Sequence, residues 1–95
     1  MAGRVDPKHL AGLLGTAGKA IAAMPEGKRV VDEVRRAATR DDLLFVLRSA
    51  DLGLDDPAAD TVRRAAADAK HWEEVKATLL RSAELQLTER YSSNA

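Results

Sequence analysis

The stretch Leu43-Leu44-Phe45-Val46-Leu47 is the longest run of large apolar residues in the sequence, and it contains the one phenylalanine. It directly follows the acidic pair Asp41-Asp42. Successive residues of a helix are rotated by about 100°, so five apolar positions in a row cover its whole circumference. The run therefore predicts a short central helix over about 40–50 that is buried on all sides. On this expectation Phe45→Asp unfolds the domain, because the change buries an unpaired charge.

The composition indicates one small domain over residues 1–95, near the size at which a single core is just sufficient. The sequence has no cysteine, which excludes disulfides and thiolate metal sites and fits a reducing cytoplasm. Lysine plus arginine and aspartate plus glutamate both number 15, so the net charge is zero. No overall field attracts the protein to nucleic acid or to an anionic membrane. We expect a cytoplasmic protein.

The charges are nevertheless unevenly distributed along the chain. Residues 28–40 carry five basic and two acidic side chains, whereas residues 41–60 carry six aspartates and one arginine. This polarity suits packing against itself or against a charged partner. Four arginines of the basic segment are candidate contacts for phosphate or for an acidic partner: Arg29, Arg35, Arg36 and Arg40. The preferred alternative is that they pair with acidic residues of the same chain.

The first helix is expected to begin at Asp6-Pro7, where aspartate can cap and proline suits the first helical position. Apolar residues then recur at three- and four-residue spacing over 10–24. This stretch is too short for a bilayer, which needs about 20 residues, and no membrane association is predicted. A cleaved signal peptide ending near Ala20-Ile21-Ala22 is the alternative. Three glycines and Lys19 interrupt the apolar stretch and favour a retained amphipathic helix.

Those glycines, Gly12, Gly15 and Gly18, recur every three residues on the side opposite the apolar stripe. Each costs about 1 kcal/mol relative to alanine in an exposed helix interior. The preferred explanation is a first helix that is loosely wound or broken. The alternative is a groove of small residues where another backbone approaches closely.

Capping signals set the remaining boundaries. A second helix is expected over 28–38, and Thr39 should cap the central helix. Gly53 should end that helix, and Asp56-Pro57 repeats the pattern of a helix start.

A single helix over 57–91 would be about 52 Å long, against a diameter of about 30 Å for a compact domain of this size. Its apolar register slips between Ala69 and Glu73. We prefer a kink there, with Asp68 as a new cap, over a continuous helix that packs on a second chain. The polar residues 92–95 are expected to form a frayed tail.

The second half of this C-terminal segment carries large apolar side chains and resembles a docking face. We expect a protein interface there. Its candidate residues are Trp72, Leu79, Leu85, Leu87 and Tyr91. For Trp72, a place in the core is the more favoured alternative.

The motifs that could bind a nucleotide or a metal ion, or catalyse a reaction, are incomplete in this sequence. Gly15-Thr16-Ala17-Gly18-Lys19 lacks the first glycine, the final serine or threonine and the preceding strand of a phosphate-binding loop. His9 and His71 lack a metal-ligand spacing, and the aspartates of 51–60 lack the pattern of a calcium loop. No nucleophile stands beside a convincing base. We expect no enzyme activity, cofactor, metal or small-molecule ligand.

The sequence thus predicts an all-α, compact bundle of four to five helices, with a short buried central helix and a long or kinked C-terminal helix. The predicted function is a non-catalytic interaction module, acting as a homo-oligomer or as an adaptor or small subunit of a larger protein assembly. The alternative is a nucleic-acid accessory protein whose arginines contact the phosphate backbone without reading sequence. A helix-turn-helix is disfavoured because both possible recognition helices begin with aspartates, which repel phosphates.

Overall fold

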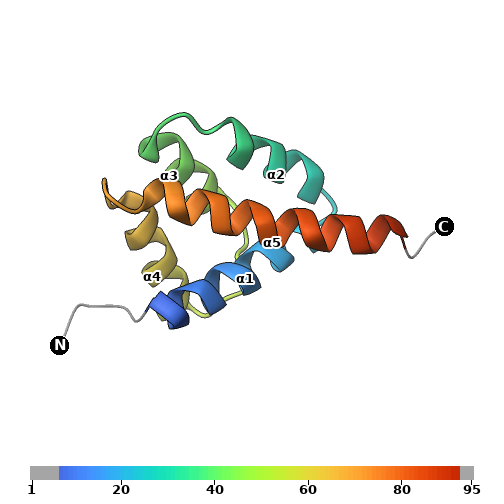
Figure 1. The fold of residues 1–95 in the computed structure, drawn as a ribbon, viewed down its shortest axis with the longest axis horizontal. Helices are drawn as coiled ribbons and strands as arrows, with labels where there is room; N and C mark the ends of the chain where they lie inside the picture. The colour runs from blue at the N-terminus through green and yellow to red at the C-terminus, as the bar shows by residue number, and fades with distance from the viewer. Residues whose placement is uncertain (1–6, 93–95) are drawn as a thin grey trace.

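The described part of the chain folds into five helices, as Figure 1 shows. The computed structural model describes the backbone of residues 7–92 and the side chains of residues 8–89. The five helices are α1 (Pro7–Ala23), α2 (Gly27–Arg36), α3 (Arg40–Ser49), α4 (Asp56–Ala67) and α5 (Trp72–Ser92). This confirms the all-α bundle of four to five helices. The expected cap at Asp6 and most of the expected tail, residues 93–95, lie outside the described residues.

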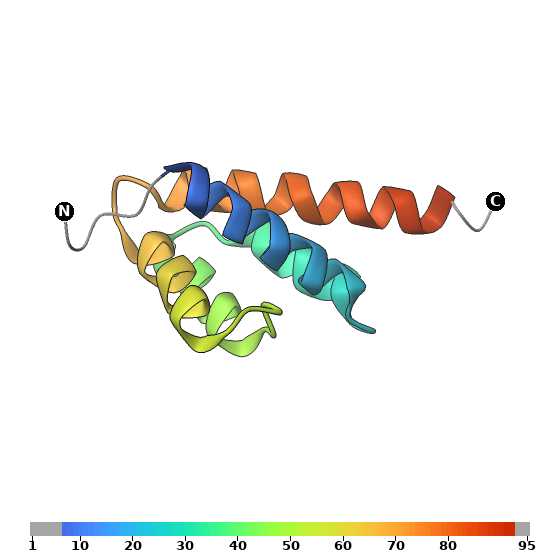
Figure 2. The ribbon, with the colours of Figure 1, turned by 90° about the horizontal axis from the view of Figure 1, so that it is seen from below.

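The helices are arranged around the longest one, α5. The contact between α1 and α5, which lie side by side, is the most extensive between any two helices. α2 packs on the other flank of α5, and α3 and α4 lie together near its N-terminal end. Figure 2 shows the C-terminal part of α5 extending past α1 and α2. This part of α5 therefore has fewer neighbours than the rest of the helix.

All five helices contribute to a single core of aliphatic and alanine side chains. Among the described residues, none that is polar or charged is buried. Burial of one large aliphatic side chain stabilises a fold by about 1.5–3 kcal/mol, so these residues supply most of the drive to fold. The largest fully buried side chains are Ile21, Leu43, Leu47, Leu79, Val31, Val34, Val62 and Val75.

The α1–α5 contact is close because α1 presents a glycine to α5. A Cβ on residue 18 would come within 2.8 Å of the Leu79 carbonyl oxygen and of Ser82 Cβ. The Ser82 hydroxyl donates a hydrogen bond to the Gly15 carbonyl oxygen at 2.7 Å. The expectation of a loose or broken first helix is wrong, since α1 is continuous over Pro7–Ala23. Gly18 lets the backbone of α5 approach, as the alternative expected, but a Cβ on Gly12 or Gly15 would meet nothing within 4 Å, so the three glycines do not form one groove against another backbone.

The central helix α3 is where the sequence predicts it, with Thr39 as its cap. The Thr39 side-chain oxygen accepts a hydrogen bond from the Asp42 backbone N–H at 3.1 Å. The expectation that all five residues of the apolar run are buried is wrong. Leu43, Val46 and Leu47 are buried, but the Phe45 side chain is 73% exposed. Neighbouring helices cover one side of α3 only, and position 45 lies on the other side.

The C-terminal segment is two helices rather than one, so the break predicted near Ala69 is confirmed. Ala66 and Val75 are both buried, yet nine residues of helix are about two and a half turns, which would place them on opposite faces. The turn at 68–71 lets both face the core. The Asp68 side chain accepts the Lys70 backbone N–H at 2.8 Å and stabilises this turn.

Three boundaries differ from expectation. α2 ends at Arg36, and Ala38 is exposed. Asp55, not Asp56, caps α4, since its carboxylate accepts the Ala58 backbone N–H at 3.0 Å. Gly53 does not end α3, which ends at Ser49 with Ala50 as its C-cap. Gly53 lies in the loop that follows and has a φ of 65°, a conformation that glycine adopts without strain.

Basic side chains satisfy carbonyl groups at the C-terminal ends of α2, α3 and α4. Such groups lack partners within their own helix and attract positive charge. The three donor–acceptor pairs are Lys76 Nζ to the Ala37 oxygen at 2.6 Å, Arg63 Nε to the Leu47 oxygen at 3.3 Å and Arg40 Nη1 to the Ala67 oxygen at 3.0 Å. Each pair joins two helices and helps fix their relative positions.

Candidate functional site

Most of the candidate phosphate-binding arginines have partners within the chain. Arg29 forms an ion pair with Glu26 at 2.7 Å. Arg35 bridges α2 and α5, with Glu84 at 3.0 Å and with Asp32 at 2.5 Å. The hydrogen bonds that Arg35 donates to the carboxylates, first of Glu84 and then of Asp32, raise the pKa of its guanidinium above the usual value.

The other two candidate arginines, Arg36 and Arg40, differ in their contacts. Arg40 donates to the Ala67 carbonyl oxygen. Arg36 is exposed, and no acidic side chain in the described part of the chain pairs with it. The four candidate arginines therefore do not form one open cationic surface, because phosphate would have to displace existing partners from three of them.

The candidate interface on α5 is divided between core and surface. Leu79 is only 1% exposed and belongs to the core against α1, so its expected place on an interface is wrong. Trp72 and Leu87 are half-buried and pack against the core. Leu85 is 58% exposed. Tyr91 is part of α5, but its side chain lies outside the described residues. Of the predicted set, Leu85 offers the clearest apolar surface.

Phe45 is the surface residue that the sequence reasoning missed. The buried residues Leu43, Val46, Leu47 and Ala50 stand at positions i, i+3, i+4 and i+7. On a helical wheel these four positions lie within about 100° of one another, and position 45 is opposite their centre. Because Leu44 and Phe45 are apolar too, the sequence pattern alone does not distinguish this buried face.

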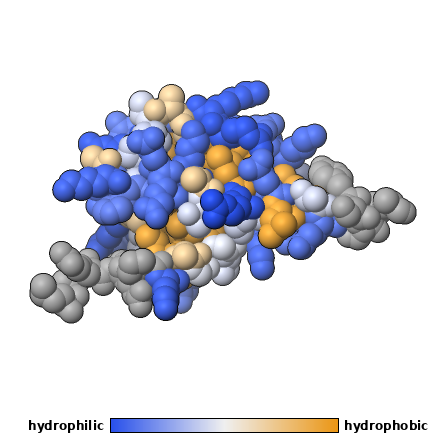
Figure 3. Space-filling view, viewed as in Figure 1, coloured by the Kyte–Doolittle hydropathy of each residue, from blue (hydrophilic) through white to orange (hydrophobic). Residues whose placement is uncertain are grey.

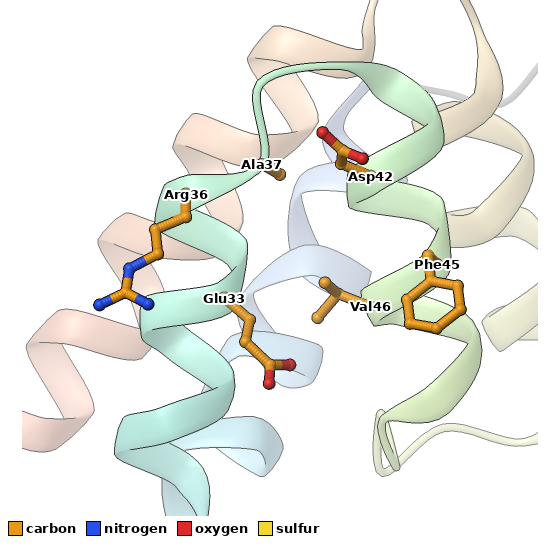
Figure 4. Close-up of a pocket in the computed structure, with 6 residues that line it drawn as sticks. All are labelled: Glu33, Arg36, Ala37, Asp42, Phe45 and Val46. Atoms are coloured by element: carbon orange, nitrogen blue, oxygen red, sulfur yellow. The ribbon is translucent and has the colours of Figure 1, made fainter.

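A shallow hollow lies beside Phe45 between α2 and α3. Figure 4 shows Asp42 and Val46 extending from α3 toward α2, with Phe45 at the edge of the hollow. Ala37 and Val46 are buried and make its base apolar, whereas charged side chains stand at its rim. The six lining residues are Glu33, Arg36, Ala37, Asp42, Phe45 and Val46.

A second hollow lies on α5 and is lined by Trp72, Glu73, Lys76, Ala77 and Leu80. Figure 3 shows the face that carries α5, where apolar atoms reach the surface along and beside this helix, among charged side chains. The amine of Lys76 is already engaged with the Ala37 carbonyl oxygen. Lys76 therefore has no free amine to offer a ligand in this small apolar hollow.

The residues considered for metal or nucleotide chemistry have local structural roles. The Gly15–Lys19 segment is inside α1 and forms no phosphate-binding loop. Asp51 accepts the Gly53 backbone N–H at 2.9 Å. His71 Nδ1 lies 3.2 Å from Asp68 Oδ2. Within the described residues, no group of three or more histidines and acidic residues is placed to hold a metal ion.

The carboxylate of Asp68 has a shifted pKa. The backbone N–H of Lys70, followed by the side chain of His71, lowers the pKa of Asp68 from its usual value. Both groups belong to the turn between α4 and α5. The shift therefore reflects the structure of the turn rather than a reactive site.

Among the helices that the structure describes, none has the length and hydropathy needed to cross a bilayer. Comparisons with protein families, with curated proteins and with solved structures find no match to the chain. The functional argument thus depends on the exposed apolar residues Phe45 and Leu85 and on the charges around them.

Proposed function

We propose that the protein is a non-catalytic helical interaction module, self-associating or serving as an adaptor or small structural subunit of a larger assembly. The observation that carries the proposal is the exposure of two large apolar side chains, Phe45 at 73% and Leu85 at 58%. The chain contains only one Phe, one Trp and one Tyr. An aromatic residue left on the surface of so aromatic-poor a domain supports a role in contact with a partner, because aromatic side chains dominate the energetics of interfaces.

The positions of the two residues support the same reading. Leu85 is exposed on α5 although Ala83 beside it is buried and Leu87 is half-buried. Phe45 borders a hollow with an apolar base and a charged rim (Figure 4). An apolar centre surrounded by polar groups is the usual composition of a protein interface. Because the chain has no cysteine, we propose the cytoplasm as the compartment.

Sedimentation equilibrium and affinity capture test this proposal together. The wild-type protein should form a homo-oligomer or retain a stoichiometric partner, and the Phe45→Ser/Leu85→Ser variant should lose that association while keeping its helical circular dichroism. Thr88→Ala, a substitution of an exposed residue on α5, is the control and should change neither result. A wild-type monomer whose captured proteins are unchanged in the double variant would contradict an interaction role for these residues.

Nucleic-acid binding is the second candidate. The observation in its favour is that Arg36 is exposed and pairs with no acidic side chain among the residues that the structure describes. Arg36→Glu should weaken binding to single- or double-stranded oligonucleotides and reduce the slope of log affinity against log salt by about 1. Arg64→Glu, at an exposed arginine on α4, is the matched control. Equal effects of the two variants, or no binding at low salt, would count against a phosphate-binding role for Arg36.

A further inference from the structure

The hollow beside Phe45 carries an unpaired negative charge on each of the two helices that form it. Glu33 extends from α2 and Asp42 from α3, and both side chains are exposed. Among the described residues, neither carboxylate forms an ion pair. Of the six described residues that line the hollow, Arg36 alone is basic, and Figure 4 shows its guanidinium pointing away from α3. The two carboxylates are therefore available to a cation from outside.

The apolar part of the hollow suits the remainder of a basic side chain. Its base consists of Ala37 and Val46, which are buried, and the Phe45 ring at its edge is 73% exposed. The aliphatic stem of a lysine or arginine covers apolar surface while its charged head remains among polar groups. The face of an aromatic ring also attracts a cation. An apolar base, an exposed ring and two unpaired carboxylates are thus complementary to a long basic side chain.

Arginine fits this surface better than lysine or a small molecule. Its guanidinium is planar, stacks on aromatic rings and is less strongly hydrated than an ammonium group. The hollow has a volume of about 310 Å³ and is open to solvent, whereas small-molecule sites enclose most of their ligand. An open hollow suits a side chain that a larger partner presents. The segment 41–60, with six aspartates and one arginine, favours a basic partner as well.

We propose that the hollow between α2 and α3 is a docking site for an arginine in a basic segment of a protein partner. The arginine stem lies over Ala37 and Val46, its guanidinium lies against the Phe45 ring, and Glu33 and Asp42 balance its charge. The inference rests on the proposed interaction function and specifies the chemistry of the partner. Because the charges are exposed and screened by salt, the contact is weak and weakens further as the salt concentration rises.

A titration of the isotope-labelled protein with a blocked peptide of alternating arginine and alanine, followed by two-dimensional NMR, tests the site. Peptide concentrations up to about 10 mM cover very weak binding. The amide resonances of residues 33–46 should shift as the peptide is added. The dissociation constant should be higher when lysine replaces arginine in the peptide, and the shifts should be absent when glutamine replaces it.

Single variants of the protein measure each contribution. Glu33→Gln and Asp42→Asn should each raise the dissociation constant about two- to fivefold, as loss of an exposed charge pair does. Phe45→Leu should raise it about two- to fivefold, because leucine is apolar but has no aromatic face. The matched control is Asp56→Asn, which removes the same charge from an exposed position on α4 outside the hollow and should leave binding unchanged. Thermal unfolding by circular dichroism checks that each variant is folded.

Three results would overturn the inference: no shifts in the wild type, equal binding of the glutamine peptide, or an equal loss of binding in Asp56→Asn. Shifts of residues 33–46 with protein concentration alone would assign the hollow to a second copy instead. All of these results leave an interaction role in place, because that role is tested by the association lost in Phe45→Ser/Leu85→Ser. Conversely, arginine-peptide binding that depends on Glu33, Asp42 and Phe45 supports the site even if the wild type is a monomer and captures the same proteins as the double variant.

Discussion

Replacing Gly18 with alanine tests the close approach of α1 to α5. The added Cβ would lie 2.8 Å from the Leu79 carbonyl oxygen and 2.8 Å from Ser82 Cβ. Neither atom is at the end of a flexible side chain, so one helix has to move away from the other. Overpacking of this kind costs about 1–3 kcal/mol, and the rigidity of the two backbones favours the upper end of that range.

Helix propensity acts in the opposite direction. Alanine is more favourable than glycine within a helix by about 1 kcal/mol, so the expected net loss of unfolding free energy for Gly18→Ala is about 2 kcal/mol. For a domain of this size that corresponds to a fall in Tm of about 8–16 °C.

Gly12→Ala in the same helix is the matched control. A Cβ on residue 12 meets nothing within 4 Å, so only the propensity gain remains, and Tm should rise by up to about 8 °C. Thermal and urea unfolding followed by circular dichroism measure both variants. If Gly18→Ala stabilises the protein as Gly12→Ala does, the close approach of α5 to α1 is not present in solution.

Three further predictions follow from α3 and from the α4–α5 turn. Leu47→Asp should unfold the domain because Leu47 is fully buried, whereas Phe45→Asp should cost about 1 kcal/mol of unfolding free energy or less. Unfolding followed by circular dichroism compares the two variants. Equal losses of stability would refute the assignment of Leu47 to the buried face of α3 and Phe45 to the exposed face. Thr39→Ala should cost about 1 kcal/mol in urea unfolding and Thr39→Ser much less, since the hydroxyl accepts the Asp42 N–H; identical midpoints would argue against this cap. Because the Asp68 pKa is lowered, its contribution to stability is present above the ordinary value of 3.8 and is lost as the pH falls through the lower folded value. As the pH falls below that value, the Tm of Asp68→Asn should therefore decrease less than the Tm of the wild type. If Tm decreases equally in both proteins, the Asp68 carboxylate does not stabilise the fold.

The candidate surfaces were only partly readable from the sequence. The pairing of Arg35 with Asp32 is local, at a spacing of three residues on one helix, and was anticipated as pairing within the chain. The contact of Arg35 with Glu84 joins α2 to α5 and depends on the packing of two helices that are far apart in sequence. Leu79 and Leu85 looked equivalent as interface candidates, but only Leu85 is exposed.

The sequence by itself determined the helices. Thr39, Asp55 and the proline at position 57 supply caps and a helix start, and the long intervals without glycine or proline allow the chain to remain helical between them. The change of apolar register near Ala69 also predicted the break before α5. These features depend on interactions within a few residues, which a local pattern records.

Only the tertiary structure decided which faces are covered. Five apolar residues in a row allow every side of α3 to be buried, but the neighbouring helices cover one side, and Phe45 remains exposed. Likewise Gly12 and Gly18 belong to the same local pattern, yet only Gly18 meets another backbone. Burial depends on what lies nearby in space, so the residues with the best claim to function became identifiable only once the helices were packed.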